Sequence, residues 1–284
     1  MFDTAIIVLL YNKEIAQSTT LSSLMLEEAH FKNAKLVIWN NGPKKLESYD
    51  VSFIAELGYD ITIEETLNNE SLAYIYNSFI NSHEAEKYIF LDDDSTLNAN
   101  YIDEASRSNS SVVSMPIITV NGVAKNPKIN SKVYTEGVKI AANDKVFTIG
   151  SGLVVGREVI LELLKRFYTV FDERFYLYGV DTTFCHRLFL SKQSVNIRVI
   201  AGFEHSLSRL EKECKSLTKF RQRERSYDRG MTLRYYTSFP RTVYILVHSV
   251  LYTIKCIFLN KDSSMSLPLL LKSYIVGKHY RDID

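Results

Sequence analysis

Hydrophobic positions divide the first hundred residues into short apolar runs separated by segments of helical spacing. Continuous, partly β-branched apolar runs predict four buried strands, at 5–10, 35–40, 59–66 and 87–91. Between them, apolar residues recur at helical spacing over 14–30 and 71–85, which predicts two helices. Strands that alternate with helices in this way indicate an α/β fold, with a Rossmann-like, mostly parallel sheet flanked by helices.

The pattern is looser beyond residue 100. Further strands are predicted at 111–120, 145–156 and 195–205, and a helix at 157–167. The segment 171–190 starts as a loop and becomes a helix near Asp181. A charged helix is predicted over 208–236, and an apolar stretch follows at 242–259. We therefore expect two regions, an α/β domain over 1–207 and a helical C-terminal region over 208–284.

Polar side chains follow three of the predicted strands at the point where each strand ends. Tyr11 and Asn12 follow the first strand, Asn40 and Asn41 the second, and Asp92, Asp93 and Asp94 the fourth. In parallel sheets, ligands bind at the carboxyl ends of the strands. The sequence therefore predicts a binding site along this edge.

The three aspartates raise a chemical problem, because adjacent carboxylates repel and are costly to bury unpaired. A hard divalent cation such as Mg²⁺ or Mn²⁺, which prefers oxygen ligands, would resolve it. In an extended segment Asp92 and Asp94 point the same way, whereas Asp93 points elsewhere. Two alternatives stay open: the aspartates cap a following helix through Asp94 or Ser95, or they serve a nuclease, phosphatase or nucleotidyltransferase.

Charge is distributed unevenly along a chain whose formal net charge is only +1. Residues 206–284 carry 15 Lys and Arg against 7 Asp and Glu, so the body is acidic and the tail is basic. We expect the tail to face an anionic surface; the alternative is a solvated helical face. The apolar stretch 242–259 contains His248 and Lys255, which favours a helix lying in a membrane interface over a span. A helix packed on the catalytic domain is the remaining alternative.

Cysteine content and the N-terminus indicate a reduced, cytosolic setting. The three cysteines are too few and too scattered for a disulfide framework or a zinc site. The first apolar run is preceded by Asp3 rather than by basic residues, so we expect no signal peptide.

Several motifs occur in an order found in one enzyme family. They are Leu10-Tyr11-Asn12, IWNNG at 38–42, NNESLAYIYNSFI at 68–80 with Asn77, FLDDDS at 90–95, FDERFYLYGVDTTFCHRL at 171–188, and His205. In these motifs the chain resembles inverting family-2 glycosyltransferases of the GT-A fold, of the rhamnosyl or galactofuranosyl type that builds bacterial O-antigen or capsule. The resemblance runs from about residue 4 to 205. It departs from the family at Asn40, where an Asp is usual, at Glu70 and Ser71, where Gly is common, and at Val180, where an acid is frequent.

The resemblance implies a role for each candidate residue. Asp181 would be the catalytic base; Asp172 and Glu173 are weaker candidates. The metal ligands, for Mn²⁺ or Mg²⁺, would be Asp94, Asp92 and His205. The nucleotide-sugar donor, UDP- or dTDP-linked, would be bound by Tyr11, Asn12, Asn40, Asn41, Asn77, Asp92 and Asp93. From the residues alone, Asp181 is also compatible with helix capping, Tyr11 with core packing, and Asn40 and Asn41 with the turn before Pro43.

The implied reaction moves a sugar to a hydroxyl of a glycan acceptor, which would be linked to undecaprenyl diphosphate, at the cytoplasmic face of the cell membrane. The basic segment 209–234 would face that diphosphate, and no nucleic acid is expected as a partner. Two other readings remain. One is a sugar-nucleotide nucleotidyltransferase, although the chain has no Gly-rich phosphate loop near its first strand. The other is a non-catalytic protein that binds a nucleotide or lipid.

Overall fold

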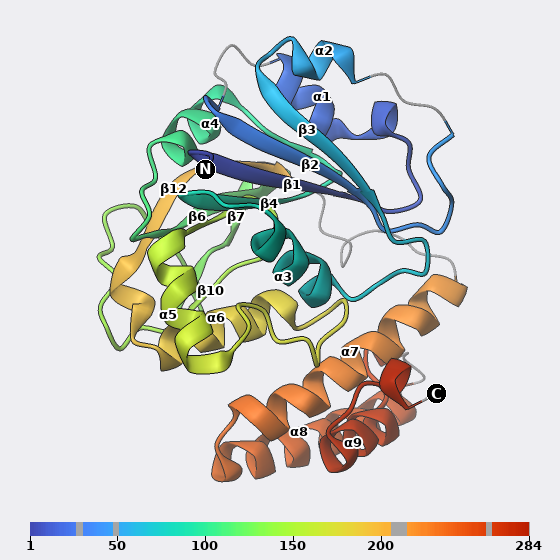
Figure 1. The fold of residues 1–284 in the computed structure, drawn as a ribbon. Coiled ribbons are helices and arrows are strands. Elements are labelled where there is room, and N and C mark those ends of the chain that lie inside the picture. Colours follow the sequence, from blue (N-terminus) through green and yellow to red (C-terminus); the bar gives the residue numbers. More distant parts are fainter. Residues whose placement is uncertain (27–30, 48–50, 206–214, 260–262, 284) are drawn as a thin grey trace.

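The computed structural model describes residues 1–26, 31–47, 51–205, 215–259 and 263–283 of the 284-residue chain. A central sheet lies between two groups of helices, and the last three α-helices form a further layer beyond it (Figure 1). The predicted α/β fold with a mostly parallel, helix-flanked sheet and a helical C-terminal extension is confirmed.

Within the described residues, nine strands form the central sheet, in the order β3-β2-β1-β4-β11-β6-β12-β5, with β7 paired to β6. Their bounds are β1 Thr4–Leu10, β2 Ala34–Asn40, β3 Tyr59–Glu65, β4 Lys87–Asp92, β5 Ser95–Thr96, β6 Val113–Val120, β7 Val123–Asn126, β11 Leu153–Gly156 and β12 Ile197–His205. Strands β3, β2, β1 and β4 run parallel, and β12 runs parallel to β6. Strand β11 pairs antiparallel with both β4 and β6, so it joins two blocks of strands that point the same way.

Helices cover both faces of this sheet, which explains why its strands are continuous apolar runs. Alternate residues of β1 enter opposite cores: Ile7 and Leu9 pack on one side, and Ile6, Val8 and Leu10 on the other. The first core contains α3 Leu72–Ser82, α5 Arg157–Phe167 and α6 Val180–Leu190. The second contains α1 Thr19–Leu26, α2 Ser52–Ala55 and α4 Ala99–Ser106.

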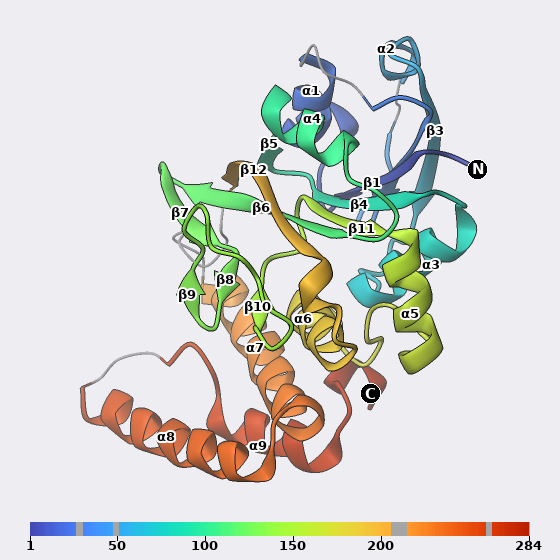
Figure 2. The same ribbon diagram turned by 90° about the vertical axis from the view of Figure 1, so that its left-hand side faces the viewer.

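A separate three-stranded sheet lies beyond β7 (Figure 2). It consists of β8 Lys128–Ile129, β9 Lys132–Val133 and β10 Val146–Phe147. The single strand predicted over 145–156 is therefore wrong, because its ends belong to two different sheets. Between them Gly152 adopts a left-handed φ of +81°, which a continuous strand does not contain.

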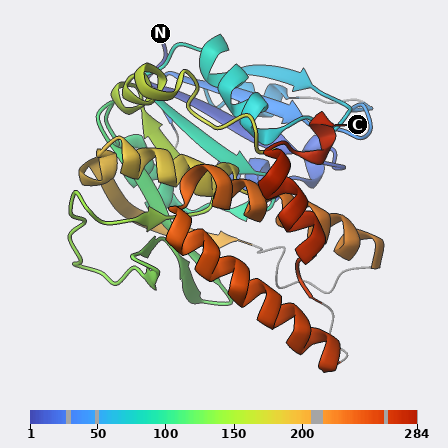
Figure 3. The same cartoon turned by 90° about the horizontal axis from the view of Figure 1, so that it is seen from below.

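The C-terminal layer consists of α7 Lys215–Tyr236, α8 Phe239–Phe258, α9 Leu267–Val276 and the short helix η3 Tyr280–Asp282. Helices α7 and α9 pack closely at Gly230, where an added Cβ atom would stand 1.9 Å from Ser273 Oγ. Seen from below, α8 lies in front of this pair (Figure 3). The boundary predicted between residues 207 and 208 lies outside the described residues, as does the start of the helix predicted at 208–236.

Most other predicted elements are present with small shifts. The helix predicted at 14–30 begins as a 3-10 turn, η1 Ile15–Gln17, and continues as α1; residues 27–30 are outside the described part. The segment 171–190 becomes helical at Val180, one residue before Asp181. A short 3-10 helix, η2 Gln193–Asn196, precedes β12, which ends on His205 as predicted.

Candidate active site

The acidic turn Asp92–Asp94 meets His205 through strand pairing. Asp92 is the last residue of β4, and the next two aspartates lead into the short strand β5. Strand β5 pairs antiparallel with the end of β12, which sets Ser95 opposite His205. As a result His205 Nδ1 lies 3.4 Å from Asp94 Oδ1, and His205 Nε2 lies 3.8 Å from Asp92 Oδ2. Two segments 110 residues apart thus supply one cluster of ligand-type atoms.

Two serines connect the cluster to strand β11. Ser95 Oγ lies 3.1 Å from His205 Nδ1 and 2.7 Å from Ser151 Oγ. Ser151 Oγ in turn accepts a hydrogen bond from the Asp92 backbone N–H at 3.1 Å. Both serines are buried, so this chain fixes the end of β4 and the imidazole ring together. Neither serine was among the predicted site residues, because their contacts arise from the pairing of segments more than 50 residues apart.

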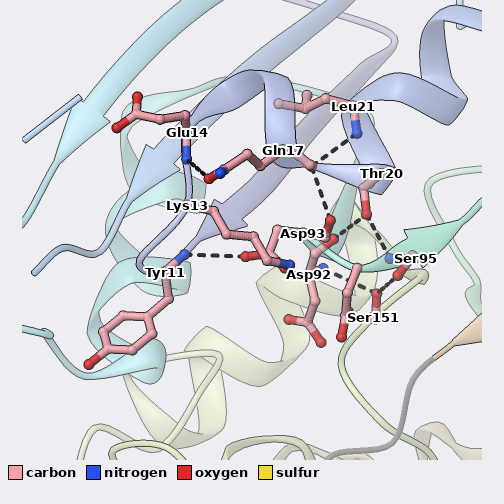
Figure 4. A network of polar contacts seen from close by, with 12 residues as sticks. Tyr11, Lys13, Glu14, Gln17, Thr20, Leu21, Asp92, Asp93, Ser95 and Ser151 are labelled. Atoms are coloured by element: carbon pink, nitrogen blue, oxygen red, sulfur yellow. Dashed lines mark hydrogen bonds and ion pairs between the residues drawn. The ribbon is translucent and has the colours of Figure 1, made fainter. Parts of the chain in front are cut away.

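The start of α1 holds the backbone of the acidic turn (Figure 4). Thr20 Oγ1 donates to the Asp92 carbonyl and accepts the Ser95 N–H, and Ser18 Oγ donates to the Asp93 carbonyl at 3.1 Å. These bonds satisfy the backbone at the point where β4 surfaces, which leaves the carboxylates of Asp92 and Asp94 to face His205.

Electrostatics make this cluster unfavourable without a cation. Burial raises the pKa of Asp92 well above its usual range, as do the charges of Asp94, Asp181 and Asp93. The Asp92 side chain keeps 41% of its surface exposed, so its charged neighbours matter alongside burial. Burial also raises the pKa of Asp94 and lowers that of His205, although the two side chains attract each other.

The donor set fits a divalent metal ion. Asp92, Asp94 and His205 each offer one ligand atom, and these atoms lie within 4.8 Å of one another. Asp94 Oδ1 is buried and has no hydrogen-bond partner among the described residues, which is costly for a carboxylate oxygen unless a ligand is bound. Two carboxylates suit Mg²⁺ and Mn²⁺, and the imidazole favours Mn²⁺. The described part of the chain contains no second group of this kind.

Asp181 faces the cluster from α6. It lies in the first turn of that helix, which begins after Gly179 in a left-handed conformation with φ of +85°. Gly150 is its close neighbour: a Cβ atom on that residue would come within 3.1 Å of Asp181 Oδ1. The charge of Asp181 also contributes to the raised pKa values of Asp92 and of the buried Tyr76. A third carboxylate thus stands near the two ligand-type aspartates, on a different element.

Asp93 points away from the cluster, as predicted, and holds the loop after β1. Its carboxylate forms an ion pair with Lys13 Nζ at 2.5 Å and accepts the Tyr11 N–H at 3.3 Å. Figure 4 shows the Tyr11 ring directed away from this network, and the side chain is 47% exposed. The core-packing alternative for Tyr11 is therefore wrong. Asn12 is also exposed, with a left-handed φ of +54°.

Three of the four asparagines expected to bind the donor have their amide groups engaged within the protein. Asn40 Nδ2 donates to the Lys44 carbonyl and to Glu65, and Asn41 bonds Thr66 and both backbone groups of Glu70. Asn77 Nδ2 donates to the Phe171 carbonyl and to Glu173 Oε1, and its Oδ1 accepts the Phe171 N–H. All three are buried. Their contacts hold the loops around the site.

Asp172 is part of a buried ion cluster rather than of the acidic site. Its carboxylate bonds Arg174 at 2.6 Å and the Tyr236 hydroxyl at 2.6 Å, and Arg187 lies 3.5 Å away. These partners lower the pKa of Asp172 despite its burial. A carboxylate held in this way is a poor proton acceptor, and the neighbouring Glu173 bonds Asn77. Neither residue competes with Asp181.

The chain matches no protein-family profile and no curated protein sequence. Solved structures with a similar course of the chain include S. aureus TarS, at 14% identity over 83% of this chain and 40% of that chain, with a TM-score of 0.46. TarS residues 1–349 in complex with UDP-GlcNAc match at 16% identity over 81% of this chain and 66% of that chain, with a TM-score of 0.46. The mannosyltransferase PcManGT from Pyrobaculum calidifontis, in complex with GDP-Man and Mn²⁺, matches at 13% identity over 82% and 63%, with a TM-score of 0.48. The chain thus spans 40% of the first TarS chain and about two thirds of the other two chains, and likeness at this level describes only the course of the backbone.

Proposed function

We propose that the chain is a divalent-metal-dependent glycosyltransferase that moves a sugar from a nucleoside diphosphate to a hydroxyl group. The observation that carries this proposal is the cluster Asp92, Asp94 and His205 at the carboxyl edge of the sheet, with Asp181 opposite it. This reaction needs two features: a group of ligands for a hard cation, and a separate carboxylate that can accept a proton.

The ligand cluster would stabilise the leaving group. When the bond between the sugar and the diphosphate breaks, negative charge accumulates on the diphosphate oxygens. A divalent ion held by Asp92, Asp94 and His205 would supply Lewis-acid stabilisation of that charge. Ser95 and Ser151 keep the histidine and the end of β4 in register for this task.

The separate carboxylate would activate the acceptor. A sugar hydroxyl is a poor nucleophile, and a carboxylate within hydrogen-bond reach increases its reactivity by accepting the proton. Asp181 fills this role in the proposal, because it faces the acidic cluster from a separate helix. Direct attack of the hydroxyl on the anomeric carbon inverts its configuration and requires no nucleophile from the protein.

The donor is proposed to be UDP- or dTDP-linked and to lie across the carboxyl end of β1. Tyr11 and Asn12 are exposed there, while Asp93 and Lys13 fix the loop that carries them. Asn40, Asn41 and Asn77 are left out of direct donor contact because their amides are engaged. A family-2 hexosyl transfer in O-antigen or capsule synthesis, with an undecaprenyl-diphosphate-linked acceptor at the cytoplasmic membrane face, is supported by the motif resemblance alone.

A thermal-shift experiment tests the proposal. The melting temperature is measured with UDP, dTDP, GDP and ADP, each with and without Mn²⁺, for the unmodified chain, Asp94→Ala and Asp103→Ala. A ligand that binds only the folded state raises the melting temperature by mass action. We expect a manganese-dependent rise with one nucleotide that is lost in Asp94→Ala. Asp103 lies on α4 in an ion pair with Arg107, so its replacement is the matched control and should keep the rise.

Turnover separates the proposal from a nucleotidyltransferase or a binding protein. Once the nucleotide is identified, the chain should slowly hydrolyse the corresponding nucleotide-sugar, with water as the acceptor, and release nucleoside diphosphate. A nucleotidyltransferase would instead release pyrophosphate from a nucleoside triphosphate and a sugar phosphate. Binding that persists in Asp94→Ala, without release of either product, would contradict the proposed function.

A further inference from the structure

Helix α8 turns its apolar side outward. On its inner side Thr242 and Cys256 are buried, and Ile245, Leu246, Ser249 and Thr253 are partly buried. The outer side is exposed and apolar, at Val243, Tyr244, Val247, Val250, Leu251, Ile254, Ile257 and Phe258. A helix on the surface of a water-soluble domain shows the reverse arrangement. In Figures 1 and 2, α8 lies on the side of the helical layer that is remote from the sheet.

The serine, threonine and histidine side chains of α8 bond to helix backbone. Ser249 Oγ donates to the Ile245 carbonyl, Thr253 Oγ1 to the Ser249 carbonyl, and His248 Nδ1 lies 3.0 Å from the Tyr244 carbonyl. Thr242 Oγ1 donates to the Leu233 carbonyl of α7. Such bonds are what an apolar environment requires, since lipid offers no partner to a free hydroxyl.

The basic residues of α8 form a line along the helix. Arg241, His248 and Lys255 are exposed and follow one another at intervals of seven residues, which places them on one side. Helix α8 contains no Asp or Glu. An apolar face bordered lengthwise by basic residues is typical of a helix in the plane of a membrane interface, where the cations reach anionic headgroups.

By length and composition alone, α8 could also cross a membrane: it has 20 residues, it is predominantly apolar, and most of its side chains are exposed. Both of its ends, however, are tied to α7. It starts three residues after α7 ends, and the chain beyond it returns to the middle of α7, where Gln222 Nε2 donates to the Ser263 carbonyl and the Ser266 N–H donates to Ser226 Oγ.

These contacts are incompatible with a span. Four residues lie between Phe258 and Ser263, and the five Cα–Cα steps that join the two reach at most about 18 Å. The hydrocarbon core of a bilayer is about 30 Å thick. A spanning α8 would carry its C-terminal end to the opposite side, away from Gln222 and Ser226 on α7.

We propose that α8 binds an anionic lipid bilayer by lying flat in its interface, with the line Val243, Val250 and Ile257 inserted and Arg241, His248 and Lys255 at the headgroups. The partner is the lipid surface itself, and binding does not depend on any reaction at the acidic site. The C-terminal helical layer then contacts the bilayer, and the central sheet lies outside the lipid.

Vesicle sedimentation with the full chain tests the partner. We expect binding to vesicles that contain phosphatidylglycerol, and weaker binding to pure phosphatidylcholine or at high salt. The double substitution Val247→Glu/Ile254→Glu should lower the partition coefficient at least tenfold. The matched control Leu161→Glu/Val195→Glu adds the same charge at two exposed apolar positions far from α8 and should leave binding unchanged. Melting temperatures establish that each variant is folded.

Tryptophan depth profiling tests the orientation. Val243→Trp, Val250→Trp and Ile257→Trp place a reporter near the start, middle and end of the same line on α8, and the buried Trp39 gives a constant background. Lipids brominated at shallow or deep acyl positions should quench all three reporters equally, at the shallow position. Deep quenching of the Val250→Trp reporter alone would show a span and overturn the proposal. A chain that binds no vesicles, or that instead forms a dimer disrupted by Val247→Glu/Ile254→Glu in light scattering, would overturn it as well.

Discussion

Asp181 and Gly150 are so close that a Cβ atom on the glycine would stand 3.1 Å from Asp181 Oδ1. The absence of a side chain at 150 therefore gives the carboxylate its place beside the turn Asp92–Asp94. Because Gly150 does not adopt a left-handed φ, a substitution there acts through this contact and not through backbone strain.

Replacement of Asp181 tests the proposed base. Asp181→Asn keeps the size of the side chain and removes its ability to accept a proton. We expect kcat to fall by about 10²- to 10⁴-fold, with little change in the metal-dependent binding of the nucleotide. Steady-state kinetics and thermal shift measured on the same preparation check both statements. If nucleotide binding and turnover fall together, Asp181 has a structural role.

A graded change at Gly150 should act in the same direction but more weakly. Gly150→Ala would displace the Asp181 carboxylate by a few tenths of an ångström, and Gly150→Ser by more. Since catalytic geometry tolerates little displacement, we expect kcat to fall about 3- to 10-fold in the alanine variant and further in the serine variant. The KM for the donor should stay unchanged in both; a change in KM alone would place Gly150 in donor binding.

His205 should determine the preference for manganese. His205→Asn removes the imidazole ligand and leaves the two carboxylates. We expect the affinity for Mn²⁺ to fall at least tenfold and the difference between Mn²⁺ and Mg²⁺ to shrink, because oxygen ligands alone discriminate less. Titration of free Mn²⁺ by electron paramagnetic resonance measures this directly. His83→Asn, at the end of α3, is the control and should bind Mn²⁺ as the unmodified chain does.

The cluster Asp92, Asp94 and His205 was predictable because its residues lie at the ends of strongly patterned strands. Asp92 follows an apolar run, and His205 ends another, so both fall on the same edge once the strands are assigned. The contact between them depends on β5, which has two residues and is too short to leave a hydrophobic pattern. The contact between Ser95 and Ser151 was not predicted either, because it joins two segments that lie more than 50 residues apart in the sequence.

The roles of the asparagines could not be predicted for a related reason. Asn77 is satisfied by Phe171 and Glu173, which lie more than 90 residues away, and Asn41 is satisfied by a loop that follows a different strand. A polar residue at a strand end is read equally well as a ligand contact or as a loop support. Only the hydrogen-bond partners of the residue distinguish the two roles, and tertiary packing determines those partners. The contacts that hold the end of α8 near α7, made by Ser263 and Ser266, could not be predicted from the sequence either, because no local pattern marks them.

Tyr236 links the C-terminal layer to the α/β half through Asp172, and its loss should lower stability. Tyr236→Phe removes the hydroxyl that donates to the buried carboxylate of Asp172 at 2.6 Å. A hydrogen bond to a buried charge contributes about 1.5–3 kcal/mol to the free energy of unfolding. Urea denaturation should show a loss of that size, with Tyr168→Phe as control because Tyr168 is 89% exposed. An unchanged midpoint would mean that Arg174 and Arg187 alone satisfy Asp172.

His186 should make the folded chain sensitive to mild acid. Burial lowers the pKa of His186 to about 4, and the nearby cations Lys145, Arg229 and Arg241 act in the same direction. In the unfolded chain the ordinary pKa is 6.5, so between pH 6.5 and 4 the unfolded state takes up a proton that the folded state excludes. Stability therefore falls as the pH falls through this window, by about 2 kcal/mol at pH 5 for this group.

The substitution His186→Gln should remove that share of the pH dependence. The difference in unfolding free energy between pH 7.5 and pH 5, measured in urea, should shrink by about 2 kcal/mol in the variant. Any loss from the missing ring contacts with Phe147 and Tyr236 affects both pH values equally, so it cancels in the difference. The control His248→Gln lies on the exposed side of α8 and should leave the difference unchanged. An unaltered pH dependence in His186→Gln would show that carboxylates such as Asp172 account for the acid sensitivity instead.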